Sequence, residues 1–127
     1  AAMGLLGKIF GMEERPMPVS VSDDNFEQEV GRSELPVLLD VWSPSCGPCK
    51  KLEPIILDLT KEFQGRVKVC ELNAADSPRT AARLGVRGTP TVLYVRDGKV
   101  VERVVGLRSS LYHRQTIEEL FGVGAEA

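Results

Sequence analysis

The strongest limit on the possible folds is an almost unbroken apolar run at residues 36–42, Pro-Val-Leu-Leu-Asp-Val-Trp. A short apolar run of this kind is typical of a central β-strand that is covered on both faces. A helical pattern follows it and can end at Gly65. Its apolar side chains recur at helical spacing, and they are Leu52, Ile55, Ile56, Leu59 and Phe63. We therefore expect helices packed against a sheet with parallel strands.

Similar patterns predict the other elements. Strands are expected at residues 19–21, 67–72, 91–95 and 100–105, and helices after Ser22, after Ser77 and at Ser109 or Ser110. Asp97-Gly98 lies between the last two strands and is the strongest short-range signal of a β-hairpin. The expected fold class is α/β, in the order β-α-β-α-β-α-β-β-α. It has a central mixed sheet of about five strands flanked by about four helices.

The length of 127 residues suits one domain. Regular patterns occupy residues 19–124, which we take as that domain. Residues 1–18 show no sustained period and contain Pro16-Met17-Pro18. We expect this N-terminal extension to be weakly structured, or to be a docking segment for a partner or a second copy of the chain. A monomer is the expected oligomeric state.

Composition excludes several classes of partner. A net charge of −2 gives no reason to expect nucleic acid, and no stretch approaches the roughly 18 apolar residues of a membrane-spanning helix. The first residues lack a basic segment and a continuous apolar segment, so the expected compartment is cytoplasmic. Three cysteines are too few for a disulfide framework, and two of them form a C-x-x-C unit.

That unit is Cys46-Gly47-Pro48-Cys49, and it lies where the apolar strand gives way to the long helix. Unpaired N–H groups and the helix dipole favour a thiolate at a helix N-terminus, so the pKa of Cys46 should be lowered. Cys49 should lie one turn deeper, close enough to form a disulfide and better shielded from solvent. The pattern predicts redox chemistry.

Several motifs at matching spacing over residues 19–122 resemble the thioredoxin family. They are Asp40-Val41-Trp42, Cys46-Gly47-Pro48-Cys49-Lys50, Gly88-Thr89-Pro90-Thr91, Asp97-Gly98 and Gly106. The resemblance implies the thioredoxin fold and a protein-disulfide reductase that serves electron transport and cell redox homeostasis. It implies no cofactor besides the redox-active cysteine pair and no metal. The implied partners are disulfide-containing proteins and a thioredoxin reductase or another electron donor.

The resemblance also implies catalytic roles. Cys46 would attack a substrate disulfide, and Cys49 would resolve the mixed disulfide. Asp40 matches the buried carboxylate that helps to take the proton from the resolving thiol. Its place within an apolar strand independently predicts that it holds its proton tightly. The alternative is an aspartate at a sheet edge or a bend.

Trp42 is either a cover beside the two cysteines or a core residue, and the resemblance implies the cover. Pro90 matches the family's cis-proline, which faces the dithiol. An extended substrate would then dock by its backbone in a groove. The residues of that groove would be Gly47, Pro48, Thr89, Pro90 and Gly106.

Two positions depart from the family's pattern. Ser45 replaces a common aromatic residue, which removes an exposed apolar contact for a reductase. Glu71 replaces a lysine that is common there. If Glu71 shares a face with Val67 and Val69, it approaches Asp40, and two nearby carboxylates raise at least one pKa. The alternative is that Glu71 reaches solvent.

Other features admit structural interpretations and rival functions. Cys70 on a strand is typical of a buried free thiol, and His113 has no partner pattern for a general base. A zinc site would need four ligands, and only Cys70 and His113 could join the C-x-x-C pair. A binding module without catalysis and an oxidant or isomerase are further alternatives. Gly47-Pro48 between the cysteines resembles reducing members of the family.

Overall fold

The computed structural model describes residues 16–124, so most of the expected N-terminal extension, residues 1–15, lies outside the described part. The elements are β1 (Val19–Val21), η1 (Glu27–Gly31), β2 (Val37–Trp42), α2 (Gly47–Glu62), β3 (Lys68–Asn73), α3 (Pro78–Arg83), β4 (Thr91–Arg96), β5 (Lys99–Val105) and α4 (Ser110–Phe121). Their order confirms the predicted order and the α/β class.

One mixed sheet of five strands has the order β1-β3-β2-β4-β5. β2 lies at its centre, parallel to β3 and antiparallel to β4. Its first five residues are buried, as expected of a strand covered on both faces. The hairpin between β4 and β5 turns at Asp97 and Gly98, whose φ angles of 53° and 74° are those of a tight left-handed turn.

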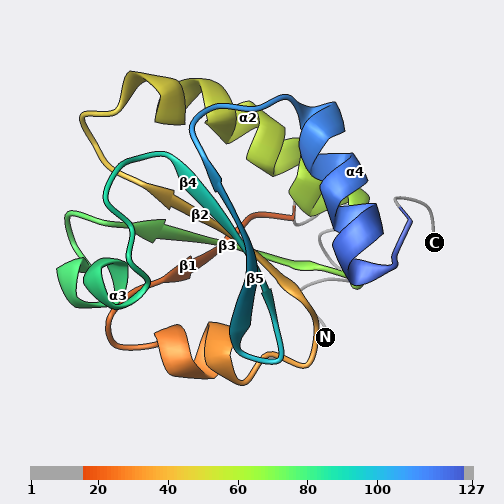
Figure 1. Ribbon diagram of the computed structural model, residues 1–127, viewed down its shortest axis with the longest axis horizontal. Helices are drawn as coiled ribbons and strands as arrows, with labels where there is room; N and C mark the ends of the chain where they lie inside the picture. The colour runs from red at the N-terminus through yellow and green to blue at the C-terminus, as the bar shows by residue number, and fades with distance from the viewer. Residues whose placement is uncertain (1–15, 125–127) are drawn as a thin grey trace, which may run out of the picture.

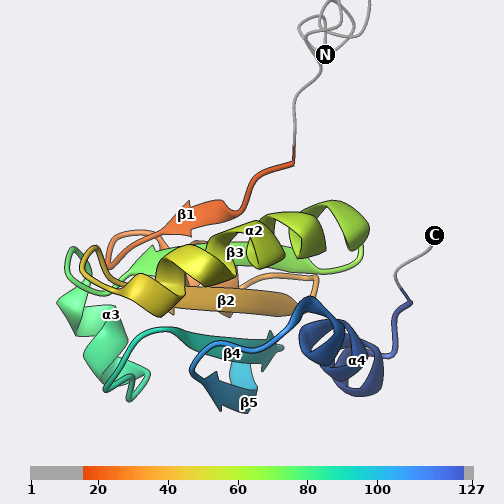
Figure 2. The same ribbon diagram turned by 90° about the horizontal axis from the view of Figure 1, so that it is seen from above.

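Helices cover both faces of the sheet (Figure 1). α2 and α4 lie on one face, where Leu38 of β2 and Tyr94 of β4 belong to the same apolar cluster as Leu52 and Ile117. η1 and α3 lie on the other face, against a second cluster that includes Leu39 of β2. α4 lies beside the C-terminal end of α2 (Figure 2), where Arg114 makes a bidentate ion pair with Glu62 at 2.7 Å. Successive residues of β2 thus face opposite helical layers.

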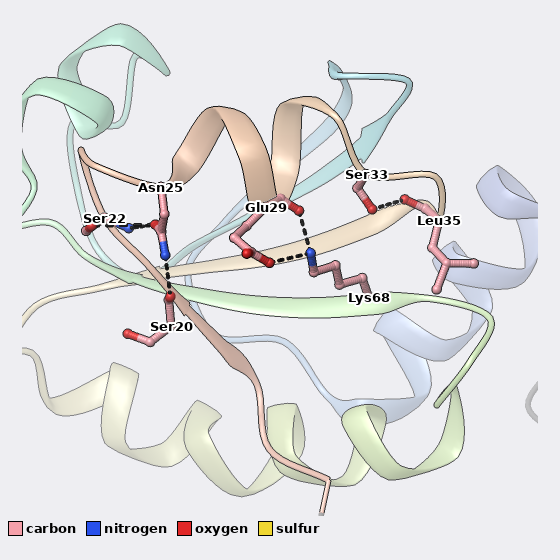
Figure 3. A network of polar contacts seen from close by, with 7 residues as sticks. All are labelled: Ser20, Ser22, Asn25, Glu29, Ser33, Leu35 and Lys68. Atoms are coloured by element: carbon pink, nitrogen blue, oxygen red, sulfur yellow. Dashed lines mark hydrogen bonds and ion pairs between the residues drawn. The ribbon is translucent and has the colours of Figure 1, made fainter. Parts of the chain in front are cut away.

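The segment after Ser22 differs from the expected α-helix. It forms a π-helical turn, η1, in which Arg32 donates to the carbonyl of Glu27 at 2.8 Å. Lys68 of β3 donates to the backbone carbonyl of Glu29 at 2.8 Å and to its carboxylate at 2.7 Å (Figure 3). Ser22 donates its N–H to Asn25 at 2.7 Å, which begins the turn. The two bonds from Lys68 join this helix of only five residues to β3. No sequence period predicts them.

The carboxyl end of β2, the start of β4 and the end of β5 meet at one edge of the sheet. Val41 pairs with Thr91, and Thr91 pairs with Val105. The chain leaves β2 at Trp42 and begins α2 at Gly47 on this same edge. Residues that follow or precede these strand ends are therefore brought together. No helix among residues 16–124 is long and apolar enough to cross a membrane.

Candidate functional site

The cysteine pair occupies the N-terminus of α2. Cys46 is the N-cap residue, and its Sγ accepts the backbone N–H of Cys49 at 3.1 Å. The two sulfurs form a disulfide, with the Cα atoms 5.3 Å apart. Gly47 and Pro48 lie exposed between them in the first helical turn. The predicted pairing is present. The start of a helix, with its unpaired N–H groups and the positive end of the dipole, favours a sulfur anion on Cys46.

The disulfide form does not show the expected difference in shielding between Cys49 and Cys46. The exposed fractions are 8% for Cys46 and 7% for Cys49, which do not separate the two residues. The sulfur of Cys46 is bonded to that of Cys49 and accepts the backbone N–H of that residue. The two cysteines differ in position and not in exposure: Cys46 is the N-cap residue of α2, and Cys49 lies within its first turn.

The Thr89–Pro90 peptide bond is cis, as the resemblance implied. Gly106 donates its N–H to the carbonyl of Pro90 at 2.9 Å, which joins the end of β5 to the residue before β4. The Oγ of Ser43 lies 2.8 Å from the Oγ1 of Thr89, and the carbonyl of Ser43 accepts the N–H of Cys46 at 3.3 Å. Ser43 thereby connects the cysteine loop to the cis-proline loop. Sequence reasoning missed it, because no motif marks a serine at this position.

Asp40 is buried in the middle of the sheet, with 6% of its surface exposed. It pairs with Glu71 of β3 on one side and with Val92 of β4 on the other. Burial, followed by the negative charges of Glu71 and Glu53, raises the pKa of Asp40 to about 7. Asp40 lies inside the central strand, so the alternative of an aspartate at a sheet edge or a bend is wrong. The raised pKa agrees with a carboxyl that holds its proton.

A cavity of about 370 Å³ connects this carboxyl to the cysteine pair. It is lined by Asp40, Trp42, Cys49, Glu53 and Glu71, and further by Met17, Pro18, Ser43, Pro44, Lys50, Ile56 and Leu57. Since one water molecule takes about 30 Å³ of liquid volume, the space admits several. Cys49 and Asp40 therefore face a common space through which a proton can pass. Sequence reasoning missed Glu53, whose only signal is its spacing of four residues from Cys49.

Trp42 is half-buried at the end of β2 and lines the same cavity. Its indole Nε1 donates a hydrogen bond to the carboxylate of Glu71. Trp42 therefore faces the cavity that Cys49 also lines, and a polar contact fixes its indole there. This contact also decides between the two expectations for Glu71, which faces the cavity instead of turning wholly to solvent.

Cys70 and His113 are fully buried and lie apart from the site. Burial raises the pKa of Cys70 to about 12, which makes its thiol a poor nucleophile. The ring Nδ1 of His113 lies 2.5 Å from the hydroxyl of Tyr94. Burial lowers the pKa of His113 to about 4. Within residues 16–124 no group of three or more His, Cys, Asp or Glu side chains could hold a metal. The ligands that a zinc site would need are thus not assembled in this part of the chain.

Comparisons with known proteins agree with this geometry. The protein-family model described as Thioredoxin matches residues 17–119. A thioredoxin of Synechocystis sp. is 39% identical over 99 residues, which is 78% of this chain and 92% of that protein. A thioredoxin of Haemophilus influenzae is 44% identical over 86 residues, or 68% of this chain and 80% of that protein. A thioredoxin of Rickettsia conorii is 42% identical over 92 residues, or 72% and 88% of the two chains.

Proposed function

The chain belongs to the thioredoxin family, and we propose that Cys46 is its attacking thiolate and Cys49 its resolving thiol. The protein is a dithiol–disulfide oxidoreductase that reduces protein disulfides. The assignment of the two roles depends chiefly on one observation. The Sγ of Cys46, and not that of Cys49, caps α2 and accepts a backbone N–H.

The reaction transfers two electrons from the dithiol to the substrate. The Cys46 thiolate attacks one sulfur of the substrate disulfide, the substrate S–S bond breaks, and the other substrate sulfur leaves as a thiolate that takes up a proton. Cys49 loses its proton and attacks the Sγ of Cys46. The mixed disulfide then breaks, which releases the second substrate thiol and leaves the Cys46–Cys49 disulfide that the structure contains.

Asp40 is proposed as the acceptor of the Cys49 proton. Both side chains line the same cavity, and a carboxyl whose pKa is about 7 can gain and lose a proton near neutral pH. Water in the cavity would carry the proton between them. Trp42 would shield the sulfurs from one side, since it lines the cavity that Cys49 also lines.

The substrate is proposed to dock across the edge of the sheet where the cysteines lie. The groove would consist of Gly47, Pro48, Thr89, Pro90 and Gly106. Gly47 and Pro48 are exposed, and Thr89 is held toward the cysteine loop by Ser43. An extended peptide with a disulfide could pair with the backbone of this loop.

The proposed partners are disulfide-containing proteins and a thioredoxin reductase or another electron donor. Ser45 is exposed beside the site and offers such a donor a polar contact in place of an aromatic one. The cysteine pair supplies the redox chemistry without a further cofactor. We propose a monomer whose domain spans residues 19–124, with residues 1–18 as an N-terminal extension. The proposed compartment is the cytoplasm, where thiols are kept reduced.

The direct test is capture of the mixed disulfide. Cys49→Ser removes the resolving thiol, so the reduced variant should form a covalent adduct with insulin that dithiothreitol releases. The wild-type protein should show at most traces of this adduct, because Cys49 resolves it. Adduct formation is measured by non-reducing electrophoresis and mass spectrometry, which locate the attached residue.

The matched control is the double variant Cys46→Ser/Cys49→Ser, which retains Cys70. It should form no adduct. Capture through Cys70, or equal amounts of adduct in the single and double variants, would refute the assigned roles. Insulin that remains oxidised in the presence of the wild-type protein and dithiothreitol, with no gain over dithiothreitol alone, would favour a binding module.

A further inference from the structure

Glu71 makes two connections within the site. It pairs with Asp40 across β2 and β3, so both side chains leave the sheet on the face that α2 covers. Its carboxylate also accepts the indole hydrogen bond of Trp42. One half-buried carboxylate therefore joins the tryptophan beside the cysteine pair to the buried carboxyl of the central strand.

We propose that Glu71 is a positioning residue of this site, which holds the indole of Trp42 against the cavity and sets the pH at which Asp40 accepts the proton of Cys49. This inference deepens the proposed function and rests on it. We assign Glu71 no direct part in the exchange of sulfur bonds. It acts through its hydrogen bond to Trp42 and through its charge on Asp40.

The charges around Asp40 single out Glu71. β3 contributes Glu71, and α2 contributes Cys49, Lys50 and Glu53 to the same cavity. β4 presents the apolar Val92 opposite Asp40, and the segment before β1 presents Met17 and Pro18. After burial itself, Glu71 is the largest influence that raises the pKa of Asp40, and Glu53 is the next.

The consequence concerns the second step of the reaction. A carboxyl that stays protonated until about pH 7 can accept a proton only above that pH. Removal of the Glu71 charge would lower the pKa of Asp40. Asp40 would then become a base at lower pH, and the resolution step would become efficient at lower pH. The attack by Cys46 would be affected much less, because its thiolate is stabilised by the start of α2.

The two steps can be separated by stopped-flow mixing of the reduced protein with the disulfide of thionitrobenzoate. The first phase releases one thionitrobenzoate as Cys46 attacks, and the second releases another as Cys49 resolves the mixed disulfide. Glu71→Gln removes the charge but retains an oxygen acceptor. It should move the midpoint of the second phase to lower pH by about one unit and leave the first midpoint in place.

A second variant tests the contact to Trp42, the only tryptophan of the chain. Glu71→Leu removes the acceptor as well as the charge. It should move the second-phase midpoint in the same direction and also change the emission and the acrylamide quenching of Trp42. Glu71→Gln should leave the tryptophan signal as in the wild type.

Glu119→Gln is the matched control, because it makes the same substitution at an exposed position of α4 that does not line the cavity. It should change neither readout. An unmoved second midpoint in Glu71→Gln, or an unmoved tryptophan signal in Glu71→Leu, would overturn the inference. Release of fewer than two thionitrobenzoates per wild-type protein would instead show that the proposed function itself is wrong.

Discussion

Replacing Cys46 by serine is expected to lower the rate of insulin reduction by a factor on the order of 10⁴ or more. A serine hydroxyl stays protonated at neutral pH and supplies no anion at the start of α2. The first bond to the substrate sulfur then cannot form, and Cys49 has nothing to resolve. The rate is measured with dithiothreitol as electron source, after subtraction of the rate with dithiothreitol alone.

Cys70→Ala is the control for this substitution. Cys70 is fully buried, and its thiol has a pKa of about 12, so its loss should leave the rate within about twofold of the wild type. It should cost some stability, because it removes a buried sulfur. If Cys70→Ala reduced the rate as strongly as Cys46→Ser, the site would have to lie elsewhere.

Asp40→Asn is expected to stabilise the oxidised protein in alkaline solution. Folding raises the pKa of Asp40 from 3.8 to about 7, so the folded state binds more protons than the unfolded state between these values. The contribution of Asp40 to stability is therefore complete below pH 3.8 and is lost as the pH rises through 7. Asparagine carries no charge at any of these values, so the advantage of the variant over wild type should grow by about 3 kcal/mol between about pH 5 and 9.

The measurement is the free energy of unfolding in urea at several pH values. His113 acts in the opposite direction, because burial lowers its pKa from 6.5 to about 4 and the unfolded state binds more protons between these values. It is common to both proteins, so the difference between Asp40→Asn and wild type isolates Asp40. The variant should also slow insulin reduction about tenfold or more, since it removes the proton acceptor. A stability difference that does not change with pH would contradict the account of Asp40.

Local patterns predicted most of the fold because each carries its own physical cause. The apolar run at residues 36–42 became the central strand β2, and Asp97-Gly98 became a left-handed turn. Ser109 caps α4 by accepting the N–H of Tyr112, and Gly122 ends that helix with φ at 66°. In these cases neighbouring residues alone decide the structure.

Details that depend on distant contacts were not predictable, although the elements themselves were. α3 begins after Ser77, as predicted, but the side chain of Ser77 makes no capping bond. The carboxylate of Asp23 accepts the N–H of Thr80 at 2.8 Å instead. The π-helical form of η1 is likewise held by Lys68. Both contacts join residues that lie far apart in the sequence, and no periodicity records them.

The same division applies to the site. The cysteine pair, Asp40 and the cis-proline follow from motifs, because each motif matches a family pattern. The links between them do not, since Ser43 with Thr89 and Trp42 with Glu71 depend on how the strand ends are aligned and on side-chain orientation. The departure from the family pattern at Glu71 suggested an approach to Asp40, which the strand register places opposite it. Its hydrogen bond to Trp42 was not anticipated.

The central claim is that the start of α2 stabilises a sulfur anion on Cys46. It is tested most directly by the rate at which iodoacetamide alkylates Cys46 in the reduced protein, followed by mass spectrometry across the pH range. We predict a thiol pKa clearly below the value of about 8.5 for free cysteine, and at neutral pH a faster reaction than that of free cysteine. A Cys46 pKa of about 8.5 or higher, with alkylation no faster than that of the free amino acid, would contradict the claim.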